Sequence, residues 1–295
     1  MWRARACVVA AAVLWSWSGA FVKILRPPNV AGTSDTPLPW ALGEPPVPPL
    51  VIAFYRCLFA GLAFAPWIRR QHVSWSWGLL PVVGSFAAMN ALFVSALGLG
   101  TAANAIFLQY TAPVWLLLGS VWLLGETVSR WTIWTVSLAM AGVGIIVAGA
   151  WGSEDLFAAG IALGSGIAYA GVILGLRYLR DRATHWLTLC NHWAAALVLL
   201  PVVWMYPAPR TEQIVFLAFF GTVQMALPYW LVARGLRQLS PQEVGMLSLL
   251  EPVLNPVWAY LVAGERPASA TLWGGACILW ALVLRYAPGL LGRNY

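Results

Sequence analysis

Residues 101–126 read TAANAIFLQYTAPVWLLLGSVWLLGE, and this stretch decides the fold because it occurs twice. Moved forward by 139 residues, it falls on residues 240–265, SPQEVGMLSLLEPVLNPVWAYLVAGE. Each copy begins at a small hydroxyl residue, runs apolar through a central proline and ends at Gly-Glu. The aligned pairs include Pro113 with Pro252 and Glu126 with Glu265. A duplicated unit predicts an architecture built from repeats.

The composition indicates an integral membrane protein. Of the 295 residues, 61% are hydrophobic and 9% are charged, whereas soluble domains carry about 25% charged residues. A fold in water cannot cover so much apolar surface, so lipid must solvate most of it. The formal charge of +7 comes without a basic cluster or a groove-reading motif. We therefore expect no nucleic-acid partner.

Four cysteines lie in four different apolar segments, without CxxC spacing and without a histidine cluster. Neither a disulfide framework nor a metal site is expected from them, and the sequence indicates no cofactor.

Ten segments have the length and apolar character that a membrane-spanning helix needs, about 20 residues. The first follows Arg3 and Arg5 and is too long for a signal peptide, without an A-x-A cleavage pattern. Between the first two segments, the proline-rich residues 26–48 predict an extended or irregular loop. The predicted spans are residues 6–25, 49–67, 77–97, 101–124, 131–149, 157–177, 184–205, 211–232, 241–263 and 269–287.

Basic residues predict the orientation of the chain. With the N-terminus inside, twelve arginines fall in cytoplasmic segments and four basic residues fall outside. This bias predicts cytoplasmic N- and C-termini in a cell inner membrane. The outer four are Lys23, Arg26, Arg210 and Arg266.

The repeat then implies an inversion. We divide the chain into residues 1–150 and 151–295, each with five helices, so the second half enters the membrane from the opposite side. Glu126 is expected at the cytoplasmic face and Glu265 at the outer face. Inverted halves are typical of secondary transporters, whose site lies between the repeats near the midplane.

The sequence WSWSGAFVK at residues 15–23, Arg56 in the second span and the doubled proline-to-Gly-Glu stretch resemble the drug/metabolite transporter superfamily, EamA type. This resemblance covers essentially the whole chain. It implies an all-α fold of ten transmembrane helices in two inverted five-helix repeats around a central cavity, and export or exchange of a small organic metabolite. The superfamily carries amino acids, drugs, nucleotide sugars and other solutes, so the cargo stays open. One difference between the two copies is that Ala112 in the first aligns with Glu251 in the second.

Glu251 is the sharpest candidate for chemistry. It lies ten residues into a helix that begins near Pro241, which is about 15 Å and therefore close to the middle of the bilayer core. A carboxylate at this depth is costly and is usually functional or paired. It is a candidate proton carrier or a partner for a cationic substrate. Alternatively it is a hydrogen-bonded structural carboxyl that fills the backbone gap left by Pro252.

Other polar and aromatic residues inside the spans are candidates for binding the cargo. Amides and hydroxyls also hydrogen-bond between helices in lipid, and aromatic side chains also serve as packing, so both interpretations stay open. The candidates are Trp15, Trp17, Asn90, Gln109, Tyr110, Tyr169, Gln224, Tyr229 and Asn255.

Lys23 and Arg56 are cations near the outer ends of the first two spans. Both could extend to the interface, or one could gate the outer mouth or pair with an anionic group. With Glu251 they form the coupling and gating candidates.

Three classes of function compete. An enzyme is disfavoured because the sequence has no HExxH, GxSxG, P-loop or paired acidic metal motif. A channel usually surrounds an axis with identical subunits, whereas this chain carries an inverted repeat. The favoured interpretation is an alternating-access carrier for a small organic solute in the lipid bilayer. Proton coupling and homodimer formation are compatible with the sequence and are not decided by it.

Overall fold

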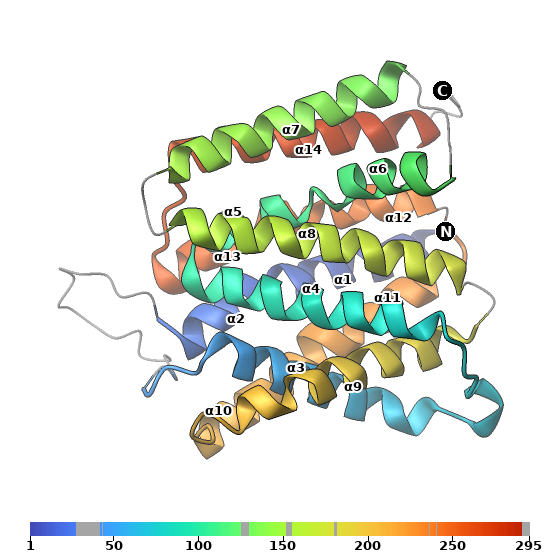
Figure 1. The fold of residues 1–295 in the computed structure, drawn as a ribbon, viewed down its shortest axis with the longest axis vertical. Coiled ribbons are helices and arrows are strands. Elements are labelled where there is room, and N and C mark those ends of the chain that lie inside the picture. The colour runs from blue at the N-terminus through green and yellow to red at the C-terminus, as the bar shows by residue number, and fades with distance from the viewer. Residues whose placement is uncertain are drawn as a thin grey trace.

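A computed structural model describes residues 1–27, 42, 44–124, 130–151, 155–179, 182–235, 237–239 and 241–290. Glu126, Ser240 and most of the proline-rich loop, about which the sequence makes predictions, lie outside these residues. Throughout the described part of the chain, the regular structure is helical, with no strand. Figure 1 shows the helices running in one general direction, with their connections at two ends.

We number the spans 1 to 10 in chain order and give the helices of each. In the first half they are α1 (Trp2–Ser16) with α2 (Ser18–Leu25), α3 (Pro49–Phe64), α4 (Leu79–Leu99), α5 (Ala102–Gln109) with α6 (Ala112–Leu124), and α7 (Arg130–Ala150). In the second half they are α8 (Asp155–Tyr178), α9 (Thr184–Val203), α10 (Thr211–Phe219) with the π-helical η3 (Phe220–Ala226) and α11 (Leu227–Gly235), α12 (Pro241–Ser248) with α13 (Leu250–Ala263), and α14 (Ser269–Leu290). Two short helices, η1 (Ala65–Trp67) and η2 (Arg70–His72), follow span 2.

Nine of the ten predicted spans match, to within a few residues, helical stretches of the described chain that could cross a membrane, and the count of ten stays a prediction. Among the described residues, nine helical stretches are long and apolar enough to cross a membrane, and a shorter apolar stretch is Ser269–Arg285. Large apolar side chains on the outside of the bundle stay exposed, including Trp134, Leu197 and Trp273. Such a surface requires lipid around it. The chain is therefore a multi-pass membrane protein.

The two halves run in opposite senses. In Figure 1, α1 begins at the end of the bundle marked N, and α8, the first helix of the second half, begins at the other end. We call these the N-terminal end and the Glu265 end. The C-terminal end of α6 and the start of α7 lie at the N-terminal end, whereas α13 leads into α14 at the Glu265 end. This is the inverted arrangement that the repeat predicts.

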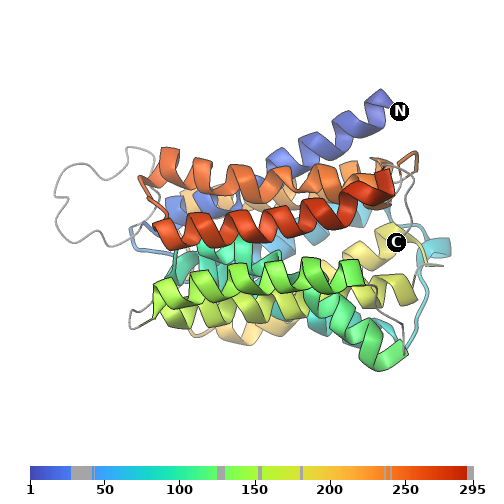
Figure 2. The ribbon, with the colours of Figure 1, turned by 90° about the horizontal axis from the view of Figure 1, so that it is seen from above.

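Helix pairing repeats with the same symmetry. Span 3 packs on span 6 through α4 and α8, and five spans later span 8 packs on span 1 through α11 and α1. In the same way, span 4 packs on span 6 and its equivalent, span 9, packs on span 1. Span 2 packs on its own equivalent, span 7, and span 5 packs on span 10. Most close pairs therefore join one half to the other, and Figure 2 shows this interleaving from above.

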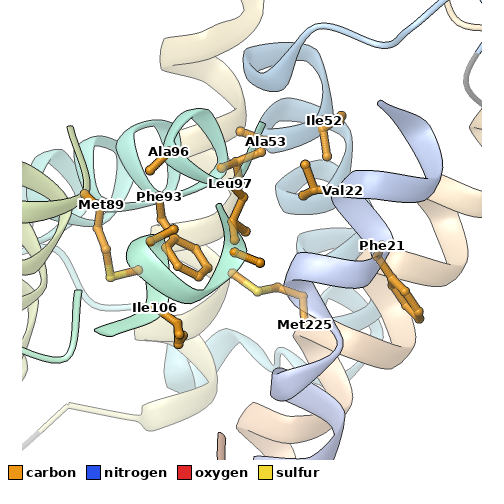
Figure 3. Packing of buried hydrophobic residues seen from close by; sticks show 14 of the residues in the cluster. Phe21, Val22, Ile52, Ala53, Met89, Phe93, Ala96, Leu97, Ile106 and Met225 are labelled. Atoms are coloured by element: carbon orange, nitrogen blue, oxygen red, sulfur yellow. The ribbon is translucent and has the colours of Figure 1, made fainter. Parts of the chain in front are cut away.

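Small residues permit the closest approaches. A Cβ atom at Gly142 of α7 would lie 2.5 Å from the Gly274 carbonyl oxygen of α14, so these backbones touch as in other small-residue membrane contacts. The main core gathers buried apolar side chains from helices of both halves, and Figure 3 shows how Val22, Ile52, Leu97 and Met225 pack within it.

Candidate functional site

Spans 4 and 9 are broken at equivalent positions of the repeat. The first helix of each span ends at Gln109 and at Ser248, which are partners in the 139-residue alignment. The second helix carries Pro113 or Pro252 in its first turn, where a missing N–H costs little. The duplicated prolines thus restart each helix at the same place in both halves.

The two breaks meet through Tyr110. Its hydroxyl oxygen lies 2.8 Å from Glu251 Oε2 and 3.1 Å from the Ser248 carbonyl oxygen. In a continuous helix, that carbonyl would accept from the N–H of residue 252, which here is a proline. The Tyr110 hydroxyl can therefore donate to either of two acceptors at the break, the Ser248 carbonyl oxygen or the Glu251 carboxylate.

Arg56 lies in the interior of the protein, on α3 of span 2. It is 4% exposed and does not extend to the membrane surface, so the interfacial alternative for this residue is wrong. Its Nη2 donates to Asn90 Oδ1 at 3.1 Å and lies 3.2 Å from Met225 Sδ. The guanidinium carbon lies 5.2 Å from the Phe220 ring centre, a cation–π geometry. No described residue accepts a hydrogen bond from Nε or Nη1.

Span 8 brings two further candidates to the same region. Gln224 Nε2, on the π-helical η3, donates to the Trp15 carbonyl oxygen at 2.9 Å. The rings of Trp15 and Tyr229 meet edge to face at 5.2 Å. Tyr229 lies near enough to Arg56, Tyr169 and Glu251 for their charges to influence it. A π-helical turn inside an α-helix is often found at functional sites.

Span 1 is also interrupted, at Trp17, and α13 holds the interruption. Asn255 Nδ2 donates to Ser18 Oγ at 2.9 Å, and Trp258 Nε1 donates to Ser16 Oγ at 2.9 Å. The Trp17 and Trp258 rings stack with centroids 4.3 Å apart. No hydrogen-bond partner for Asn255 Oδ1 exists among the described residues.

Lys23 closes the Glu265 end of the bundle. Its Nζ lies 2.9 Å from Glu265 Oε2 and donates to the Gly100 carbonyl oxygen at 2.8 Å. Glu265 Oε1 accepts from the Ala102 N–H at 2.6 Å, so it caps the start of α5. The Lys23 and Glu265 side chains are only 6% and 9% exposed. Lys23 therefore does not extend to the interface but joins spans 1 and 4 to the end of span 9.

The structure divides the predicted site residues into groups. The central group consists of three sets of contacts: Arg56 with Asn90, Trp15 with Gln224 and Tyr229, and Tyr110 with Glu251. Tyr169 joins this group because, like Arg56 and Glu251, it lies near enough to Tyr229 to influence it electrostatically. Trp17 and Asn255 lie beside the break in span 1, and Lys23 lies at the Glu265 end. Gln109 is buried at the end of α5.

Sequence reasoning missed two contributors, Trp258 and Met225. Trp258 follows Glu251 and Asn255 at helical spacing on α13, and this periodicity could have revealed it. Met225 carries no comparable signal, because a methionine in an apolar span is ordinary packing. Its role becomes visible only through its contact with Arg56.

Within the described residues, no three His, Cys, Asp or Glu side chains gather as a metal site. A surface pocket of about 400 Å³ lies away from the central group, against α7 and α14. Its lining of Trp131, Trp134, Thr135, Leu138 and Leu284 is mostly apolar and offers no charged group, so we locate the candidate site at the central polar residues.

Comparisons with known proteins agree with this geometry. The EamA-like transporter family model matches residues 41–148 and 156–286. An uncharacterized transporter of Archaeoglobus fulgidus is 27% identical over 96% of both chains. The pseudopaline exporter CntI of Pseudomonas aeruginosa is 26% identical over 80% of this chain and 86% of its own. A crystal structure at 18% identity covers 99% of both chains with a TM-score of 0.64 and shows the same fold. This chain belongs to the EamA-like transporter family.

Proposed function

We propose that this protein exports a small organic solute by alternating access, with the solute held between two repeats that divide at residues 150 and 151. The observation that carries the proposal is the meeting of the two helix breaks at Tyr110, Ser248 and Glu251. Broken helices at the interface of inverted repeats are where transporters bind their cargo. The central polar residues come from both halves of the chain, so bound cargo contacts both.

The contacts at the two ends suit such a cycle. The Glu265 end is held by the buried Lys23–Glu265 pair. At the N-terminal end, Arg5 and Glu243 pair at 2.6 Å with side chains that are 48% and 18% exposed. An exposed pair contributes little stability, whereas breaking a buried one is costly. We infer that this state is closed more firmly at the Glu265 end.

The direction of transport and the orientation are part of the proposal. One relative is named an exporter of pseudopaline, which supports export as the direction. The helix ends that carry Arg5, Arg70, Arg130, Arg234 and Arg285 lie at the N-terminal end in Figure 1. Because positive residues mark the cytoplasmic side, we place the N-terminal end in the cytoplasm of an inner membrane.

Exchange across vesicles tests the carrier against a channel and an enzyme. Vesicles containing the protein are loaded with an isotopically labelled metabolite extract and diluted into unlabelled extract, and mass spectrometry follows both sides. A carrier exchanges a solute with saturation and leaves it chemically unchanged. Flux without saturation would indicate a channel, and a new product would indicate an enzyme.

Disulfides at the two ends test alternating access in a cysteine-free background. A Cβ at Gly100 would lie 2.7 Å from Ala158 Cβ, and one at Gly235 would lie 2.5 Å from Val8 Cγ2. We expect Gly100→Cys with Ala158→Cys, and Val8→Cys with Gly235→Cys, each to stop exchange when oxidised and to restore it when reduced. The control joins α7 to α14 through Gly149→Cys and Ala270→Cys, whose Cβ positions also touch. Exchange that continues with both ends cross-linked would contradict the proposal.

A further inference from the structure

We propose that the solute is zwitterionic, with its anionic group bound by Arg56 and Asn90 and its cationic group bound by Glu251 and Tyr110. This inference rests on the proposed carrier function and specifies the class of cargo that the same site takes.

Arg56 requires an anionic partner that the described residues do not provide. Only Nη2 of its guanidinium has hydrogen-bond contacts, with Asn90 and Met225, while Nε and Nη1 have no partner among the described residues. The two described ion pairs are Arg5–Glu243 and Lys23–Glu265, and neither includes Arg56. A buried cation is retained only when something compensates its lost hydration. The open Nε and Nη1 donors suit a carboxylate or another planar anion.

Glu251 presents the opposite charge. Its Oε2 accepts from Tyr110, and no described cation lies within ion-pair distance of its carboxylate. The side chain is partly exposed although it belongs to the central group. A carboxylate with one hydrogen-bond donor and an open face is suited to a protonated amine.

The two charges are close enough to interact but do not touch. Glu251 and Arg56 lie near enough for each charge to influence the other, and both influence Tyr229, but no ion pair joins them among the described residues. Two orphan acceptors or donors accompany them, Gln224 Oε1 and His192 Nε2. The His192 ring lies 5.3 Å from the ring of Tyr229. Unpaired buried polar atoms from spans 2, 7 and 8 lie around one tyrosine and indicate a place for a polar ligand.

Charge balance favours a zwitterion over a singly charged solute. A solute with only an anionic group pairs with Arg56 but balances the site only when Glu251 is protonated, because an ionised Glu251 would lie close to a second negative charge. A solute with only a cationic group would leave Arg56 uncompensated. One solute with both groups pairs each charge once. Because Arg56 belongs to the first half and Glu251 to the second, a zwitterionic solute bound by both also joins the two repeats.

The first test uses the detergent-solubilised full chain and a metabolite extract separated by ion exchange into zwitterionic, anionic, cationic and neutral fractions. A ligand raises the unfolding temperature of the state that it binds. We expect the zwitterionic fraction to give the largest rise. An equal or larger rise with another fraction, or no rise with any, would overturn the inference.

Variants then assign the two charges. For Arg56→Met, we expect an unfolding temperature without ligand that is equal to or above that of the parent, because an uncompensated buried charge is removed. The amount of zwitterionic fraction needed for half the shift should rise about thirtyfold or more, as expected when a buried charged contact is lost. Arg56→Lys, which keeps the charge, should retain part of the shift, and Glu251→Gln should lose it like Arg56→Met.

If Arg56 and Glu251 instead form an interaction that only stabilises the fold, the variants give the opposite result. Arg56→Met would then unfold at a lower temperature, and the ligand-induced shift would survive in the folded protein. Vesicle exchange separates the two proposals: exchange of neutral or singly charged solutes alone sinks this inference and leaves the carrier function standing. Absence of any exchange removes the carrier function itself.

Discussion

The Tyr110 hydroxyl has one proton and two acceptors within reach, Glu251 Oε2 and the Ser248 carbonyl oxygen. When Glu251 is ionised, the Tyr110 hydroxyl donates its hydrogen bond to the Glu251 carboxylate, because charge-assisted hydrogen bonds are the stronger ones. When Glu251 is protonated, its own O–H can donate to the Tyr110 oxygen, and the Tyr110 hydroxyl can then donate to the Ser248 carbonyl oxygen. At the scale of single residues, the protonation of one carboxyl group is therefore linked to a backbone carbonyl at the break of span 9.

Glu251→Gln tests this link. An amide can donate to Tyr110 as a protonated carboxyl does, so we expect the variant to fold and to lose transport or its dependence on pH. The measurement is vesicle exchange from mildly acidic to mildly alkaline pH. Tyr110→Phe is the companion variant, and loss of its hydrogen bonds should cost about 0.5–1.5 kcal/mol of stability. Exchange in Glu251→Gln that matches the parent at every pH removes Glu251 from the mechanism.

The Lys23–Glu265 pair gives a second residue-scale prediction. Lys23→Met leaves a buried carboxylate without its counter-charge, which should cost about 3–5 kcal/mol. Adding Glu265→Gln removes the charge and keeps an oxygen that can accept from the Ala102 N–H, so the double variant should recover much of the loss. Thermal unfolding in detergent compares the three proteins. A double variant less stable than Lys23→Met would contradict this account.

At the scale of elements, the interrupted spans contact one another, because span 1 packs on spans 8 and 9 and span 4 packs on span 9. Spans 1, 4 and 9 are each divided into two helices, and span 8 contains a π-helical stretch. Spans 2, 3, 6 and 7 supply continuous helices that pack around them. Interrupted helices free backbone groups and change their geometry more readily than continuous ones. We therefore assign movement to the interrupted spans and support to the others.

Pro252→Ala tests the assignment. An alanine N–H can donate to the Ser248 carbonyl oxygen, so span 9 should become more continuous and Tyr110 should lose one of its acceptors. We expect unchanged or higher thermal stability with slower vesicle exchange. Pro201→Ala is the matched control, because Pro201 lies inside the continuous helix α9. Equal effects of the two substitutions on exchange would show that the break in span 9 is not special.

At the scale of the whole molecule, the symmetric helix pairing explains how the two halves of one chain form a single bundle. Each half contributes helices that pack on the other half, and equivalent pairs recur five spans later. Such pairing would let two related arrangements of the same contacts be close in energy, as the proposed alternating access requires.

Labelling of single cysteines tests the inverted topology. Arg130→Cys at the start of α7 and Ala268→Cys before α14 occupy exposed positions at opposite ends of the bundle. In intact cells, a membrane-impermeant maleimide should label Ala268→Cys and should reach Arg130→Cys only after permeabilisation. Trp2→Cys, at the exposed start of α1, serves as the control for the Arg130 side. Labelling of both test positions from one side would remove the mechanical basis of the proposed function.

The sequence by itself determined the membrane environment, the approximate limits of the spans and the duplication. These follow from composition, hydrophobic length and a repeated pattern, which are properties of contiguous residues. The inversion also followed, because five spans in a unit reverse the direction of the next unit.

Only the tertiary structure decided which side chains meet. Tyr110 with Glu251, Lys23 with Glu265 and Arg56 with Asn90 each join separate spans. Periodicity tells which face of a helix a residue occupies but not which helix that face meets. In lipid, that choice depends on the fit of small residues and on hydrogen bonds between helices, and both become defined only when the whole bundle packs.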